Sequence, residues 1–146
     1  MEIKAYRNEF GQLHREDGPA LEYSNGDKHW YYNGRLHRLD GPALEGTDEN
    51  RVWYNDGKLH RLDGPAVERA SGTKEWWKNG QLHRLDGPAV EYLDGGKEWY
   101  KNGKRHRLDG PAIEHPDGYK EWYKNGERWL PLAERLKDVS HQNIGI

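Results

Sequence analysis

The chain has no cysteine, one methionine and one phenylalanine among its 146 residues. Without thiols it cannot form a disulfide framework or a thiolate metal site. It also has no apolar run of the length that a membrane span or a signal-peptide core requires. We therefore expect a protein without integral membrane association, located in the cytoplasm.

The charge has no strong bias either. The formal net charge is -2, and basic and acidic residues alternate along the chain. Binding to duplex nucleic acid usually needs a basic patch or stripe, so we do not expect strong binding of that kind. Hydrophobic residues make up only 33%, which alone would favour disorder. Seven tryptophans and nine tyrosines argue instead for a folded chain, because aromatic side chains bury a large area each.

A 23-residue repeat runs along nearly the whole sequence. Glycines recur at this step at Gly11, Gly34, Gly57, Gly80, Gly103 and Gly126. The same step separates His14, His37, His60, His83 and His106, and the five Asp-Gly-Pro-Ala boxes that begin at Asp17, Asp40, Asp63, Asp86 and Asp109. A fixed period of this length is typical of a repeat array.

Two turns in each repeat predict the strands. An Asn-Gly pair such as Asn102-Gly103 is the strongest short hairpin signal, because a type I′ turn needs positive φ at both residues. It places Trp99 opposite His106. If the second turn, at Asp94-Gly95, also has a two-residue loop, Val90 lies opposite Trp99.

These turns predict an all-β fold, an elongated antiparallel β-meander solenoid of two-strand repeats. Each repeat advances about 10 Å, two strand spacings. We expect a cap strand over residues 1–11, five to six repeats over 12–130, and an amphipathic helix with a tail over 131–146. In that last segment Leu132, Leu136 and Val139 fall at i, i+4 and i+7. We expect this helix to cap the last repeat; a docking peptide for a partner is the alternative.

The histidine column is the most enzyme-like feature of the sequence. Equivalent histidines lie about 10 Å apart, two strands away, whereas metal–nitrogen bonds of about 2.0–2.1 Å need ligands that converge. Five copies of one half-site also do not build a single catalytic pocket. We therefore expect structural histidines with local hydrogen bonds, no metal, no cofactor and no enzymatic activity.

Two other columns form the candidate binding site. They are an aromatic column of Tyr31, Tyr54, Trp77, Tyr100 and Tyr123, and an arginine column of Arg38, Arg61, Arg84 and Arg107. Tyrosine, tryptophan and arginine are enriched at binding hot spots, and together they can also stack on and neutralise an anionic ligand. The alternatives are that this face packs inside a rolled tube or forms a homodimer contact.

The segment Trp-Tyr-Lys-Asn-Gly-Lys-Arg-His at residues 99–106 resembles the MORN repeat, whose 23-residue unit has a Trp-x-Asn-Gly-x-x-His core. The resemblance covers about residues 12–129. After the histidine, MORN repeats usually have Gly-x-Gly, whereas residues 107–112 read Arg-Leu-Asp-Gly-Pro-Ala, which is more similar to variant repeats of bacterial, phage and large-DNA-virus proteins. The resemblance implies a single-layered, twisted, often self-associating sheet that serves as an interaction module, and some members are linked to phospholipids.

These observations favour a non-enzymatic module that binds a protein partner through an extended sheet face. By analogy with the variant repeats, it is expected to act as a phage or viral adaptor or inhibitor of a host factor, and a viral protein of this kind is expected in the host cytoplasm. The alternative is a binder of an anionic small molecule or phospholipid headgroup on the tyrosine and arginine columns.

Overall fold

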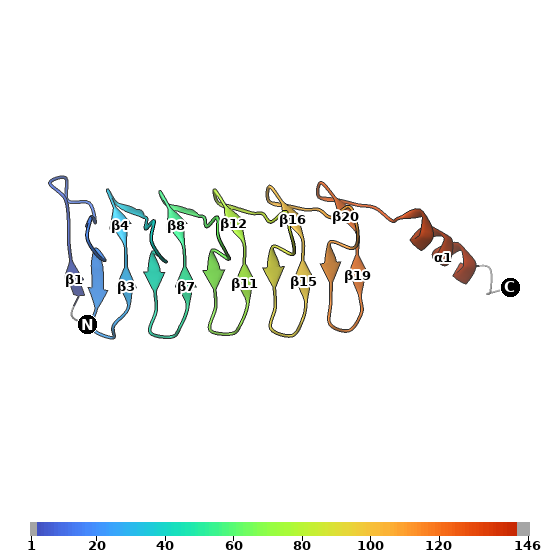
Figure 1. The fold of residues 1–146 in the computed structure, drawn as a ribbon, viewed down its shortest axis with the longest axis horizontal. Coiled ribbons are helices and arrows are strands. Elements are labelled where there is room, and N and C mark those ends of the chain that lie inside the picture. Colours follow the sequence, from blue (N-terminus) through green and yellow to red (C-terminus); the bar gives the residue numbers. More distant parts are fainter. Residues whose placement is uncertain (1–2, 143–146) are drawn as a thin grey trace.

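The computed structural model describes residues 3–142, and the side chains of residues 3–137. It is an elongated row of near-identical units in which each unit pairs with the next (Figure 1). One antiparallel sheet of eleven strands runs the length of the row, and five two-stranded hairpins stand along one side of it. The predicted all-β meander of two-strand repeats is confirmed.

The long sheet consists of β1 (Ile3–Ala5), β2 (Leu21–Tyr23), β3 (Lys28–His29), β6 (Leu44–Glu45), β7 (Arg51–Val52), β10 (Val67–Glu68), β11 (Lys74–Glu75), β14 (Val90–Glu91), β15 (Lys97–Glu98), β18 (Ile113–Glu114) and β19 (Lys120–Glu121). The hairpins pair β4 (Tyr31–Tyr32) with β5 (Arg35–Leu36), β8 (Tyr54–Asn55) with β9 (Lys58–Leu59), β12 (Trp77–Lys78) with β13 (Gln81–Leu82), β16 (Tyr100–Lys101) with β17 (Lys104–Arg105), and β20 (Tyr123–Lys124) with β21 (Glu127–Arg128).

The hairpins close with the predicted turn. In β16–β17 the two turn residues have positive φ, 51° at Asn102 and 79° at Gly103, as a type I′ turn requires. Tyr100 pairs with Arg105, and the backbone N–H of His106 donates to the carbonyl of Trp99. This half of the predicted register is confirmed.

Each tryptophan strand is divided at the tryptophan. The segment before Trp99 lies in the long sheet, and the segment after it lies in the hairpin. The N–H of Trp99 donates to the carbonyl of Ala112 in the following repeat, while its carbonyl accepts from His106 in its own repeat. The chain bends there because the strand changes partners at that residue.

The register predicted for the second turn is wrong by one residue. Val90 lies opposite Glu98, and not opposite Trp99. The loop holds three residues, 93–95, since the N–H of Tyr92 bonds to the carbonyl of Gly96 and φ of Gly95 is +95°. This is a type I turn followed by a left-handed residue, which adds one residue to the two-residue loop that the sequence suggested.

Alanines and small aliphatics form the core. The fully buried residues are one alanine per repeat, and the mostly buried ones are the residues that follow three of them. They are Ala20, Ala43, Ala66, Ala89 and Ala112, with Val67, Val90 and Ile113. Among the described residues no large side chain is fully buried, and the sheet does not close on itself. The tryptophans are half-buried in an open, single-layered array.

The histidines join neighbouring repeats. Nδ1 of His60 accepts a hydrogen bond of 3.0 Å from the backbone N–H of Asn79, in the turn of the next hairpin. The other four make the same contact at 2.9–3.0 Å: His14 with Asn33, His37 with Asp56, His83 with Asn102 and His106 with Asn125. The histidines are hydrogen-bonded as predicted, but the expected local partner is wrong: the partner is a turn 19 residues further along, and Asp63, three residues after His60, is bound by Arg61 instead.

The two ends differ from the repeats. β1 forms the first edge of the long sheet and pairs with β2. The predicted C-terminal helix is present as α1 (Leu132–Gln142), beyond the last hairpin (Figure 1). Leu132 and Leu136 remain 68% and 61% exposed, so these two side chains do not cover the last repeat. The side chain of Val139 is not among those described. The tail expected from His141 to Ile146 is wrong for its first two residues, which belong to α1, and residues 143–146 lie outside the described residues.

Candidate functional site

Five equivalent loops follow the histidines, and we call them the arginine loops. They are residues 15–19, 38–42, 61–65, 84–88 and 107–111. In the middle loop Nε of Arg61 donates to Asp63 at 2.9 Å, and Nη1 donates to the carbonyl of Pro65 at 3.0 Å and to Glu68 at 3.3 Å. One guanidinium thus holds both sides of the bend.

The same guanidinium lies over a tryptophan ring. Its central carbon is 3.9 Å from the ring centre of Trp53, and three other loops repeat this distance. The other pairs are Arg38 with Trp30, Arg84 with Trp76 and Arg107 with Trp99. All four predicted arginines are therefore brought together with tryptophans, which stabilises the loops through stacking and cation–π attraction.

Each arginine also faces two carboxylates. In the second loop Arg38 contacts Asp40 at 2.9 Å and Glu45 at 2.8 Å, which leaves the trio with one negative charge. The adjacent guanidinium holds the pKa of Asp40 below its ordinary value by hydrogen bonding and by its charge, and Arg61 does the same for Asp63. The arginine column therefore presents no uncompensated positive charge.

The predicted aromatic column lies in the first strand of each hairpin, at Tyr31, Tyr54, Trp77, Tyr100 and Tyr123. These side chains are half-buried. Trp77 donates through its indole nitrogen to Glu75, two residues earlier, and Tyr123 donates to Glu121 in the same way, each at 2.9 Å. Residues i and i+2 of a strand share a face, so the aromatic column faces away from the tryptophan that precedes each member.

The two predicted columns therefore lie on opposite faces of the array. The arginines lie with the tryptophans, and the aromatic column lies with glutamates and with Arg105, whose Nε donates to the Tyr100 hydroxyl at 3.3 Å. Burial, together with the nearby Tyr23 and Tyr54, raises the pKa of Tyr31. The binding role of both columns stays a prediction, but they do not form one joint surface.

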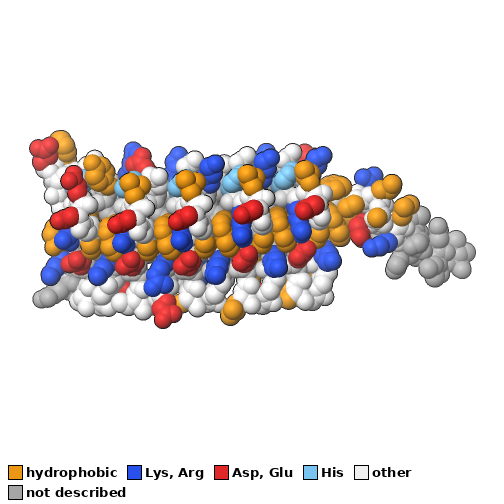
Figure 2. Space-filling view, viewed as in Figure 1, with side chains coloured by type: hydrophobic (Ala, Val, Ile, Leu, Met, Phe, Trp, Pro, Cys, Tyr) orange, Lys and Arg blue, Asp and Glu red, His pale blue; other side chains and the backbone are white. Residues whose placement is uncertain are grey.

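A column that the sequence reasoning missed is the most exposed apolar feature of the repeats. It consists of the leucines that follow the arginines, Leu39, Leu62, Leu85 and Leu108, which are 65–81% exposed. Figure 2 shows hydrophobic side chains in a band along the long axis, with acidic and basic side chains alternating beside it. Soluble monomeric proteins rarely expose large apolar patches, and those that they do expose mark interaction sites. The regular row of exposed leucines is therefore a candidate interaction site.

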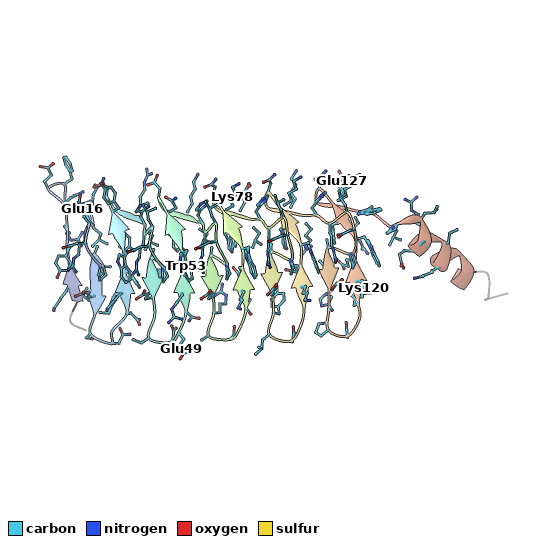
Figure 3. The ribbon with its side chains drawn as sticks, in the orientation of Figure 1. Glu16, Glu49, Trp53, Lys78, Lys120 and Glu127 are labelled. Atoms are coloured by element: carbon cyan, nitrogen blue, oxygen red, sulfur yellow. The ribbon has the colours of Figure 1, made fainter. Side chains whose placement is uncertain are left out.

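Neighbouring arginine loops enclose a groove. We number the grooves 1 to 4 from the N-terminus, groove 1 lying between loops 15–19 and 38–42. They have volumes of 590–730 Å³ and share their walls, since each inner loop lines two grooves. Trp30, Trp53, Trp76 and Trp99 line grooves 1, 2, 3 and 4 in turn. Figure 3 shows Trp53 midway between the lower sheet and the upper hairpins.

The first loop shows that leucine is not needed to fold the bend. It has Glu16 where the other loops have leucine. Arg15 nevertheless contacts Asp17 and the carbonyl of Pro19 at 3.1 Å each, as in the other loops, and lies 4.1 Å from the ring of Tyr6. The sequence already shows glutamate in place of leucine at residue 16. This difference could have indicated that the fold does not need the leucines, in contrast to the arginines, which hold the bend in every loop.

The described residues contain no group of three or more histidine, cysteine or acidic side chains placed to hold a metal. Burial and the nearby lysines lower the pKa of His83 and of His106, which favours the neutral ring that accepts the turn N–H. Between residues 3 and 142 there is also no helix with the length and apolar character of a membrane span.

A scan against models of protein families gave no match, and a search of curated proteins also gave none.

Proposed function

We propose that this chain is a non-enzymatic interaction module that binds an extended segment of a partner protein along grooves 1 to 4. Such a module acts as an adaptor or an inhibitor by occupying that segment. The observation that supports it is the leucine column. Four leucines stand exposed at one repeat position beside four tryptophan-lined grooves, while Glu16 fills the same position in a loop whose arginine still contacts Asp17 and the carbonyl of Pro19.

The composition of the grooves also supports protein binding. Hot spots are enriched in tryptophan and arginine and lie where apolar side chains can exclude water. Each groove combines a tryptophan, at least two arginines and at least one exposed leucine. We further propose that the repeat is a variant of the MORN repeat, on the basis of its period and its Asn-Gly turns.

The arginine contacts argue against the alternative of an anionic ligand on the arginine column. A phosphate or carboxylate approaching Arg61 would have to displace Asp63 or Glu68 from the guanidinium. It would then gain little charge attraction, because the trio already has one negative charge. We therefore retain the protein partner as the proposed ligand.

Affinity capture with matched variants tests the proposal. The test protein carries Leu62→Glu and Leu85→Glu, which copy the natural Glu16. The control carries Leu93→Glu; Leu93 is 80% exposed, like Leu62 at 79%, but lies in the second turn and lines no groove. We expect a partner that is retained by the unmodified protein and the control and lost from the double variant. Equal retention by all three proteins would overturn the proposal.

A further inference from the structure

The spacing of the grooves points to the conformation of the bound segment. One repeat contributes two strands of the long sheet, so successive grooves lie about 9.6 Å apart. A polyproline II helix has three residues per turn and a rise of about 3.1 Å, which returns the same face every 9.3 Å or so. Its side chains would stay in step with all four grooves.

Other extended conformations lose this match. A β-strand returns the same face after two residues, about 6.7 Å, and would be out of phase at the next groove. An α-helix returns nearly the same face after seven residues, about 10.5 Å, and would drift by about 3 Å across the three intervals between four grooves.

We propose that the grooves bind a proline-rich segment of a partner protein as a polyproline II helix, with three residues per groove and an apolar side chain at every third position. This inference rests on the proposed function and adds the chemical class of the partner. Proline-rich segments bind aromatic-lined grooves in several recognition modules, because the preformed helix loses little entropy on binding.

The groove tryptophans provide donors for such a ligand. Within the described residues, no hydrogen bond is donated by the indole nitrogens of four tryptophans, Trp30, Trp53, Trp76 and Trp99. None of these four nitrogens is fully buried, whereas Nε1 of Trp129 is buried and has no hydrogen-bond partner. Each of the four nitrogens therefore keeps some contact with solvent. A polyproline II backbone has no internal hydrogen bonds, so its carbonyls are free to accept from donors spaced one repeat apart.

The charges along the row give the ligand a direction. The charged residues of groove 1 are Arg15, Glu16, Asp17, Arg38 and Asp40, which sum to -1. Those of groove 4 are Arg84, Asp86, Lys101, Arg107 and Asp109, which sum to +1 over the lining residues with His106 neutral. The glutamates that pair with these arginines number two at each end, so the difference of two charges between grooves 1 and 4 does not depend on them.

Groove 3 also sums to +1, because Lys78 lines it at the position of Lys101, whereas groove 1 has Tyr32 there. Figure 3 shows Glu16 at the first repeat and Lys78 on an upper hairpin further along. Charge complementarity therefore favours a ligand with basic residues over groove 1 and acidic residues over grooves 3 and 4.

Selection from displayed peptides tests this inference. Three libraries of 12-residue peptides differ only in pattern, with random residues at the remaining positions. The first has leucine or proline at every third position and proline after each of them. The second alternates apolar and random residues, and the third has a helical pattern of leucines. Each is selected on the unmodified protein, on the double variant Leu62→Glu and Leu85→Glu, and on the control Leu93→Glu.

We expect the first library alone to be enriched, about tenfold or more, on the unmodified protein and the control, and this enrichment to be lost on the double variant. The selected peptides should have acidic residues at one end, a preference that Lys78→Glu with Lys101→Glu reverses. Leucine-dependent enrichment of the second or third library would overturn the polyproline II inference and leave the proposed function standing. No leucine-dependent enrichment in any library would overturn both.

Discussion

The guanidinium carbon of Arg61 lies 3.9 Å from the centre of the Trp53 ring, and Nε of the same group holds Asp63 at 2.9 Å. We predict that Arg61→Lys lowers the free energy of unfolding by about 1–2 kcal/mol, because an ammonium group cannot stack and reach both sides of the bend. Denaturant unfolding measures the change. Arg35→Lys is the control, since the Arg35 side chain is 64% exposed and forms a surface ion pair with Asp56. Equal losses would contradict the structural role given to Arg61.

Glu49 has φ of +70° at a turn position where four other repeats have glycine. A left-handed conformation costs a residue with a Cβ atom about 1–2 kcal/mol. We predict that Glu49→Gly stabilises the protein by about 1 kcal/mol in the same unfolding measurement. The reverse change, Gly118→Glu, should destabilise it by a similar amount, because Gly118 has φ of +91° and no neighbour within 4 Å of an added Cβ. A loss of stability in Glu49→Gly would show that its side chain has a separate role.

Ala89 is fully buried, and its N–H and C=O both bond to neighbouring strands. We predict that Ala89→Leu destabilises the protein by about 1–3 kcal/mol, since a single-layered core has no space for three further carbons. Ala70→Leu is the matched control at an exposed turn and should change stability by less than about 0.5 kcal/mol. Similar melting temperatures for the two variants would mean that the array opens easily around the alanine column.

The pKa of His83 and that of His106 are lowered, chiefly by burial and then by nearby lysines. The unfolded chain therefore binds more protons than the folded one just below pH 6.5, and stability falls as the pH falls through that range. Full stability is present above pH 6.5 or so, the ordinary pKa of histidine. We predict a lower melting temperature at pH 5.5 than at pH 7.5.

Substitution of the acceptor checks that prediction. His83→Gln keeps an oxygen that can accept from the N–H of Asn102 but does not titrate, so its melting temperature should depend less on pH. His115 lies in an exposed turn and is outside the histidine column, so His115→Gln should leave the dependence unchanged. An identical pH profile for all three proteins would exclude His83 as a cause of the pH dependence.

Local signals in the sequence were sufficient for the hairpins. The Asn102-Gly103 turn and the Tyr100–Arg105 pair were both predictable, because a type I′ turn determines the register of the two strands beside it. The second turn was not, because Asp94-Gly95 is compatible with a two-residue loop and with a three-residue loop. That one residue moves the partner of Val90 from Trp99 to Glu98.

The candidate site was harder to predict than the fold. Sequence spacing gives the column to which Arg61 belongs, but not the face toward which its long side chain turns. The stacking on Trp53, which separates the arginines from the aromatic column, depends on the bend at 61–65. The exposure of Leu62 could not be predicted from the sequence either, because a leucine at a fixed repeat position is usually part of a core.

In the proposed function, the shared groove walls relate the length of the bound segment to the number of repeats. A groove forms only between two adjacent arginine loops, so five loops give four grooves. Removing one whole 23-residue unit, such as residues 58–80, would join equivalent residues and take away one groove, about 10 Å of the row. The length of the bound segment would thus change by one groove for each repeat gained or lost. Duplication of a repeat within the gene would lengthen the bound segment without a new kind of contact.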